Sequence, residues 1–230
     1  MPALQRIACL HTAESNIRVF DDALGKSGLT GVVLRHAVRA DLLAAAEQAG
    51  GLTPMISRQT GQVLRELCNE ADAVLLTCST LGPAAEAVAP DAAAPILRVD
   101  AALAADAVKD GGSIAVLCAV ETTVEPTRLL FERAAQDTGA KIAMHLVPGA
   151  WDVFKAGDRD RYLGMIARAA NDAAAAGATQ VALAQASMAD AADLAASHQR
   201  PLTSPTAGLM AAIKAASLTE RTPVSSEAGE

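Results

Sequence analysis

The chain has 230 residues, of which 51% are hydrophobic and only 2% aromatic, and its formal net charge is -7. The negative net charge argues against a typical nucleic-acid-binding surface, which needs clustered Lys and Arg side chains. The longest apolar runs fall far short of the roughly 20 residues that cross a bilayer, so no membrane partner is expected.

Short segments rich in Val, Ile and Leu alternate with longer Ala-rich segments of helical period, which is typical of repeated βαβ units with parallel sheets. The expected strands are 5–10, 31–36, 72–77, 95–98, 113–118, 141–146 and 180–184. The expected helices are 16–26, 40–49, 59–70, 83–88, 100–109, 125–138, 158–176, 188–197 and 205–217.

Two halves of the chain match each other. RIACLHTAE from residue 6 aligns with SIAVLCAVE from residue 113, an offset of 107 residues, and DAVLLTC from residue 72 aligns with TQVALAQ from residue 179 at the same offset. An offset larger by two residues, 109, pairs His36 with His145. Two ordinary βαβ series of similar composition would be the alternative, but the shared order of elements favours a structural duplication.

The duplication predicts an α/β fold of two similar lobes, each with a parallel sheet flanked by helices, related by a pseudo-twofold axis. Ligands of such folds bind at the carboxyl ends of the strands, so we expect a cleft between the lobes. We assign residues 1–98 and 205–218 to lobe one and 99–204 to lobe two. The polar residues 219–230 are expected to be a flexible tail.

Cys78 ends a predicted buried strand and opens a Cys-Ser-Thr-Leu-Gly-Pro turn that leads into a helix. Backbone N–H groups at a helix N-terminus favour a thiolate there. The alternative is a buried, inert cysteine, which is how we interpret Cys9 and Cys68. None of the four cysteines has a Cys-x-x-Cys partner, and no secretory signal precedes them, so the reducing cytoplasm is expected.

Polar side chains near the strand ends are candidates for substrate binding. Helix capping is an alternative role for each Ser, Thr or Asn among them, and Pro126 suits a first helical turn just after two of the threonines. The candidates are Asn16, Ser79, Thr80, Thr122, Thr123, Gln185 and Ser187.

The segments LLTCSTLGP, VALAQASMAD and SIAVLCAVETTVEPT resemble the aspartate/glutamate/hydantoin racemase superfamily, which also contains arylmalonate decarboxylase and maleate isomerase. The resemblance implies a cofactor-independent isomerase acting on a small carboxylate, a homodimer or higher oligomer, and two cysteines that face one substrate carbon from opposite sides. Cys78 matches the first cysteine. Gln185 stands where the second is expected, and a carboxamide does not exchange that proton at neutral pH.

Three interpretations follow. The chain is a one-thiol enzyme such as a decarboxylase, or Cys118 takes the second role with His11 lying near Cys78, or the chain is a small-molecule-binding protein that has lost the reaction. No nucleotide-binding Gly-rich motif is present, and His11, His36, His145 and His198 are scattered along the sequence, so neither a cofactor nor a metal is expected.

Overall fold

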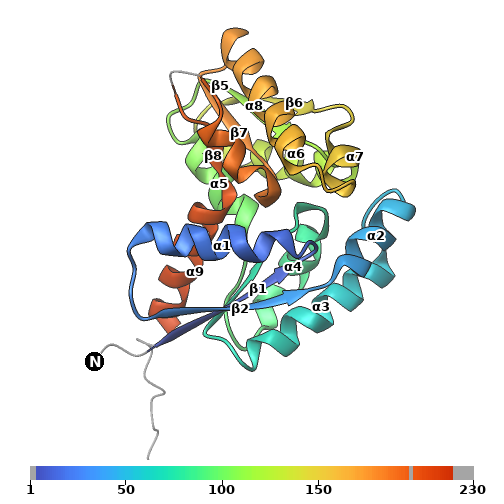
Figure 1. Cartoon of the computed structure of the whole chain (residues 1–230). Helices are drawn as coiled ribbons and strands as arrows, with labels where there is room; N and C mark the ends of the chain where they lie inside the picture. Colours follow the sequence, from blue (N-terminus) through green and yellow to red (C-terminus); the bar gives the residue numbers. More distant parts are fainter. Residues whose placement is uncertain (1–3, 197–198, 220–230) are drawn as a thin grey trace, which may run out of the picture.

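The computed structural model describes residues 4–196 and 199–219, which form two α/β lobes, one above the other in Figure 1. His198 and the predicted tail beyond Thr219 lie outside the described residues. Among the described residues, no helix is both long enough and apolar enough to span a membrane.

Each lobe is built on a four-stranded parallel sheet. The first sheet has the order β2-β1-β3-β4 and the second the order β6-β5-β7-β8, so the same topology occurs twice and the lobes are related by a pseudo-twofold axis. The strands of the first sheet are β1 (Gln5–His11), β2 (Val32–Val38), β3 (Ala73–Leu76) and β4 (Ile96–Arg98). Those of the second are β5 (Ser113–Cys118), β6 (Lys141–Leu146), β7 (Gln180–Leu183) and β8 (Leu202–Thr203).

Helices cover both faces of each sheet, which is why the apolar central strands carry no polar face. In lobe one, α1 and α9 pack on the face that holds Ile7 and Cys9, and α2, α3 and α4 pack on the face that holds Ala8 and Leu10. In lobe two, α5 and α6 cover one face and α8 covers the other. The α-helices are α1 (Ser15–Ser27), α2 (Ala40–Gln48), α3 (Pro54–Cys68), α4 (Gly82–Val88), α5 (Val99–Val108), α6 (Glu121–Ala135), α7 (Ala150–Lys155), α8 (Arg159–Ala175) and α9 (Ser204–Thr219).

Three 3-10 helices complete the described elements: η1 (Ser79–Leu81), η2 (Ala89–Asp91) and η3 (Ala186–Asp193). The prediction of an α-helix over 188–197 was therefore wrong in type as well as in bounds, and residue 197 lies outside the described part. α7 and β8 were not predicted at all.

Two helices, α3 and α6, begin about one turn earlier than the sequence suggested. α3 begins at Pro54 because the Thr53 side chain caps it by accepting a hydrogen bond from the N–H of Ile56. α6 begins at Glu121, so Pro126 lies inside the helix and not in its first turn. A proline there has no N–H to offer the carbonyl of Thr122, one turn earlier.

The strand register corrects one part of the repeat. Cys9 lies beside His36 on β2, and Val116, its equivalent in lobe two, lies beside Met144 on β6. His36 therefore corresponds to Met144 and not to His145. Since neighbouring residues of a strand face opposite sides, this one-residue difference leaves His145 exposed while His36 faces the helices of its lobe.

Candidate active site

Cys78 and Gln185 occupy equivalent places in the two lobes. Each lies two residues beyond the end of a central strand and directly before a 3-10 helix, with similar extended backbone angles of φ -116 and ψ 114 at Cys78 and φ -113 and ψ 140 at Gln185. Both side chains line one cavity between the lobes. The repeat predicted this pairing, and it follows from the shared topology, because the carboxyl ends of parallel strands meet at one edge of each sheet.

The cavity is small and uncharged. Its volume is about 30 Å³, which is the space of roughly one water molecule. None of the described residues that line it carries a formal charge. The lining residues are Thr12, Ala13, Asn16, Leu43, Thr77, Cys78, Ser79, Val120, Thr123, Trp151, Phe154, Gln185, Ala186 and Ser187.

Cys78 is 9% exposed as a residue, and burial raises the pKa of its thiol above the usual value. Hydrogen bonds from the Thr12 side chain and from the backbone N–H groups of Leu81 and Thr80 lower that pKa, but by less than burial raises it. The expectation of a thiolate was therefore wrong. At neutral pH Cys78 is a thiol, and so a proton donor, because desolvation of the charged form outweighs the hydrogen bonds that stabilise it.

The Gln185 amide is oriented by the backbone that follows β5. Its Oε1 accepts hydrogen bonds from the N–H of Ala119 at 2.5 Å and of Val120 at 3.2 Å. Only the carbonyl side of a carboxamide can accept two N–H groups, so its NH₂ is the part that remains for a ligand. Gln185 thus presents hydrogen-bond donors on the side of the cavity where its sequence position predicted a second thiol.

Three further candidates line the same cavity. Ser79 donates to the carbonyl of Ala184 at 3.4 Å, and Ser187 shares a hydrogen bond of 2.9 Å with the hydroxyl of Tyr162. Asn16 is 6% exposed, and its buried Oδ1 has no hydrogen-bond partner in the described structure. An unpaired buried amide oxygen is costly, so it fits a site where a ligand supplies the missing donor.

Thr80, Thr122 and Thr123 form a hydroxyl cluster between the lobes. Thr80 Oγ1 lies 3.1 Å from Oγ1 of both Thr122 and Thr123, and of the three only Thr123 lines the cavity. The two lobe-two threonines lie inside the first turn of α6, which has no side-chain cap. They bridge the lobes where helix capping was the alternative expectation.

Comparison with known proteins shows which solved structures share this fold. No family model matches the chain, and no curated protein matches it in sequence. Among solved structures, the aspartate racemase of Picrophilus torridus matches with a TM-score of 0.72 over 93% of this chain and 94% of its own, at 14% identity. The glutamate racemase of Thermus thermophilus, solved with beta-chloro-D-alanine, matches with a TM-score of 0.69 over 94% and 82%, at 16% identity.

The allantoin racemase of Pseudomonas fluorescens matches with a TM-score of 0.62 over 93% and 92% of the two chains, at 15% identity. The chain has the fold of the aspartate, glutamate and allantoin racemases. The resemblance noted in the sequence is thereby confirmed at the level of the fold.

Within the racemase fold, Cys118 is turned away from the cavity. Its side chain is 0% exposed and packs among apolar residues under α5 and α6. Burial raises the pKa of its thiol to about 12. Cys118 follows the same alternation as Ile114 and Val116, so it faces the helices although it ends the strand beside the one that leads to Gln185.

His11 is also off the cavity. It is 0% exposed, and burial, with a smaller contribution from the nearby His36, lowers its pKa to about 3. Its Nδ1 lies 2.8 Å from the hydroxyl of Thr77, the residue before Cys78, and its Nε2 lies 2.9 Å from Nδ1 of His36. His11 and His36 are far apart in the sequence, but the register of β1 and β2 brings them together.

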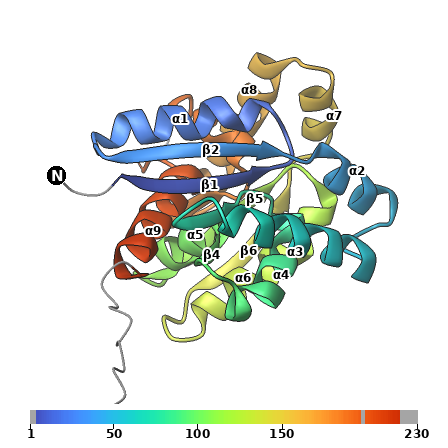
Figure 2. The same cartoon turned by 90° about the horizontal axis from the view of Figure 1, so that it is seen from below.

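Aromatic side chains on the cavity wall were not predicted. Trp151 and Phe154 stack with ring centroids 4.8 Å apart on α7, and both line the cavity. Trp151 Nε1 donates to Oε1 of Glu47 on α2, 2.6 Å away, and so joins the lobes where α2 and α7 lie at the same end of the molecule in Figures 1 and 2. The low aromatic content gave no reason to expect this cluster, because composition does not tell which side chains meet in space. The only sequence feature that could have pointed to it is that Trp151 is the single Trp of the chain.

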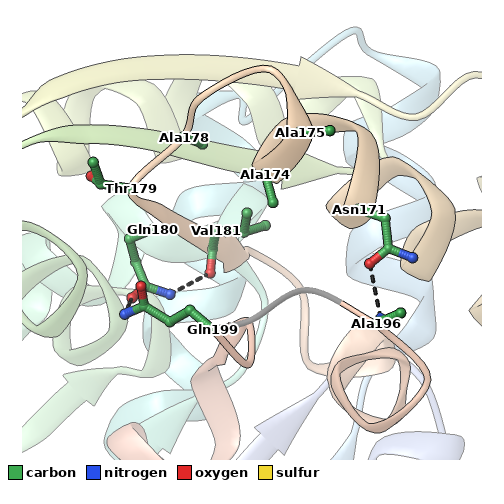
Figure 3. A pocket seen from close by; sticks show the side chains of 9 residues that line it. All are labelled: Asn171, Ala174, Ala175, Ala178, Thr179, Gln180, Val181, Ala196 and Gln199. Atoms are coloured by element: carbon green, nitrogen blue, oxygen red, sulfur yellow. Dashed lines mark hydrogen bonds between the residues drawn. The ribbon is translucent and has the colours of Figure 1, made fainter.

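A larger hollow of about 510 Å³ lies at the opposite end of β7 (Figure 3). Four alanines line it, and two of its polar side chains form hydrogen bonds with nearby backbone groups. Asn171 accepts from the N–H of Ala196, and Gln180 donates to the carbonyl of Val181. None of its described lining residues is titratable. The described residues of this hollow therefore offer no group for acid/base chemistry.

Proposed function

We propose that this chain is a cofactor-independent enzyme that transfers a proton to a carbon atom next to a carboxylate or carbonyl of a small acid, with Cys78 as the donor. The observation that supports this most strongly is the buried thiol of Cys78 in a cavity shared with the Gln185 amide. The racemase fold supports the same class of chemistry at a coarser level.

The arrangement favours a reaction that needs only one proton carrier. Racemisation removes a proton from one face of the carbon and delivers one to the other, so it requires a second acid/base group. The Gln185 amide cannot act as one at neutral pH. Cys118 and His11 lie off the cavity, so neither position supports that second role. Decarboxylation needs a single donor and is the reaction class that fits this site.

In that reaction the bond between the carboxylate carbon and the neighbouring carbon breaks, CO₂ leaves, and the bonding electron pair stays on the substrate carbon. The remaining carboxylate or carbonyl delocalises this charge, and hydrogen bonds from Gln185 and from nearby hydroxyls stabilise it. The Cys78 S–H then gives its proton to the carbon, and the thiolate takes a new proton from water. An uncharged cavity suits this step, because it favours the loss of a localised carboxylate charge.

The test is a panel of small disubstituted malonates and amino acids, incubated with the protein in D₂O. We expect CO₂ release with one deuterium on the product carbon for at least one malonate. Cys78→Ala should abolish release while ligand-induced thermal stabilisation persists. The matched control is Cys68→Ser, which changes a thiol that does not line the cavity and should retain full turnover.

Other outcomes reject the proposal. Undiminished turnover in Cys78→Ala removes the thiol from the reaction. Racemisation of an amino acid with α-hydrogen exchange means that a second proton carrier exists. Ligand-induced stabilisation without CO₂ release or exchange identifies a binding protein.

We also propose a homo-oligomer and a cytoplasmic location, as the resemblance and the unpaired thiols suggest. Light scattering of the purified protein tests the first, and a single-chain mass would reject it.

A further inference from the structure

Three side chains with metal-binding atoms meet on the face of the first sheet that α1 and α9 cover. Cys9 and His11 are two residues apart on β1, so they face the same side, and His36 lies beside Cys9 on β2. The thiol of Cys9 and one ring nitrogen of each histidine all lie within 4.8 Å of one another. This cluster is separate from the cavity of the candidate active site, since none of the three lines that cavity.

Hydrogen bonds orient the His11 ring within the cluster. Its Nδ1 lies 2.8 Å from Oγ1 of Thr77, and that hydroxyl can also donate to the carbonyl of Leu10, 3.0 Å away. With the hydroxyl proton on that carbonyl, Thr77 Oγ1 accepts from Nδ1, and the neutral His11 ring carries its lone pair on Nε2, on the side of His36.

His36 is fixed in a similar way from the other side. Its Nε2 lies 3.1 Å from Oδ1 of Asp21 on α1, and a carboxylate only accepts, so this nitrogen donates. A neutral His36 ring then carries its lone pair on Nδ1, which lies 2.9 Å from Nε2 of His11. In this tautomer the two lone pairs face each other, and a metal ion between them can accept both. With the Thr77 hydroxyl turned to Nδ1 of His11, Nε2–H of His11 instead donates to His36, and the hydrogen bonds are complete without an ion.

We propose that Cys9 Sγ, His11 Nε2 and His36 Nδ1 bind a divalent first-row metal ion of the zinc class. One thiolate and two imidazoles are ligands that zinc prefers. With the ion bound, each histidine would donate its other N–H to an oxygen, Thr77 in one case and Asp21 in the other, which is how metal-binding histidines are usually oriented. This inference departs from the sequence, which gave no reason to expect a metal, and it does not depend on the proposed function.

Charge and space are compatible with the ion. The thiolate and the Asp21 carboxylate together balance its two positive charges, and the thiol proton is released to solvent on binding. Two nitrogens about 2.0–2.1 Å from a tetrahedral ion stand roughly 3.3 Å apart, so the rings need to separate by a few tenths of an ångström. His36 lies on an edge strand and Asp21 is 56% exposed, which gives this adjustment room and the ion a path from the surface.

The position indicates a stabilising role. The ion would join β1 to β2 and, through Asp21, hold α1 on the sheet. Since β1 also carries the chain toward Thr12 in the cavity wall, metal binding would stiffen one side of the active-site cavity without touching a ligand there.

The test uses the full chain freed of metal by chelation and titrated with Zn²⁺ or with Co²⁺, whose thiolate complexes have a charge-transfer band in the near ultraviolet. We expect one ion per chain, that band with Co²⁺, and a higher melting temperature with Zn²⁺. Cys9→Ser should lose the band, and His36→Gln should weaken binding at least tenfold.

Two matched control variants change a thiol and a histidine that lie outside the cluster. Cys68→Ser and the exposed His145→Gln should bind like the wild type. Failure to bind an ion stoichiometrically, or a cobalt band that persists in Cys9→Ser, overturns the proposal and leaves a hydrogen bond between the rings. Denaturant unfolding of each metal-free variant shows that a loss of binding is not a loss of folding.

Discussion

Cys78 and Gln185 are the same position of a duplicated unit, occupied by two side chains of different chemistry. Each follows a central strand, each precedes a 3-10 helix, and both line one cavity. One side of the cavity therefore offers a proton, and the other offers only hydrogen bonds. This asymmetry within a symmetric fold is the basis of the predictions about the site.

Gln185→Glu should weaken carboxylate binding without destabilising the fold. The new side chain keeps an oxygen for the N–H groups of Ala119 and Val120 but replaces the amide donors with a negative charge in an uncharged cavity. We expect affinity for the carboxylate substrate to fall at least about tenfold, or about 1.4 kcal/mol, in a thermal-shift titration. Gln136→Glu makes the same charge change on the exposed end of α6, and an equal loss there would point to net charge alone.

Thr80→Val should weaken the contact between the lobes. It removes the hydroxyl shared with Thr122 and Thr123, and we expect the free energy of unfolding in urea to fall by about 1–3 kcal/mol. Thr60→Val is the matched control, because the Thr60 hydroxyl is equally buried but has no hydrogen-bond partner in the described structure. That variant should be neutral or more stable. Equal destabilisation by both changes would show that the cluster contributes nothing specific.

Trp151→Phe should open the cavity more often. The change keeps an aromatic ring against Phe154 but removes the N–H that donates to Glu47. We expect Cys78 to be alkylated by iodoacetamide several-fold faster, up to about tenfold, since a hydrogen bond to a charged group contributes about 1.5 kcal/mol or more. Peptide mass spectrometry measures the rate, with Cys118 as the internal control. A parallel increase at Cys118 would mean general loosening of the fold.

Stability should fall in alkaline solution. Burial raises the pKa of Cys118 to about 12, so as pH rises the unfolded chain loses this thiol proton before the folded chain does. The stabilising contribution is complete below the unfolded pKa, near 8.5, and declines by about 1.4 kcal/mol per pH unit above it until the folded pKa is reached. Cys118→Ala should reduce the slope of unfolding free energy against pH by that amount between about pH 9 and 11. An unchanged slope would mean that Cys118 ionises in the folded state as readily as in the unfolded one.

The sequence predicted the parallel sheets well because their strands are short, apolar runs flanked by helices, and β5 and β6 begin and end where expected. It missed β8, which has only two residues, and α7, which has six and follows a left-handed Gly149. Segments this short carry too little periodicity to stand out.

The site was predicted in part. The repeat paired Cys78 with Gln185, but it did not show that Cys118 and His11 face the helices. Alternation along β1 indicates the direction of His11, because His11 shares a face of the strand with Cys9, a residue that the sequence suggests is buried. The balance between desolvation and hydrogen bonding at Cys78 depends on how closely the lobes pack. No local sequence pattern reports that distance.

The size of the cavity has a consequence for how tightly any ligand is held. A space of about 30 Å³ admits no organic acid, so binding of such a ligand requires a separation of the cavity walls. Every measured dissociation constant then contains the cost of that separation, because apparent affinity is reduced by the fraction of molecules that are open. Mutations far from Cys78 that favour the open form would strengthen the initial capture of ligand and leave the reacting groups unaltered.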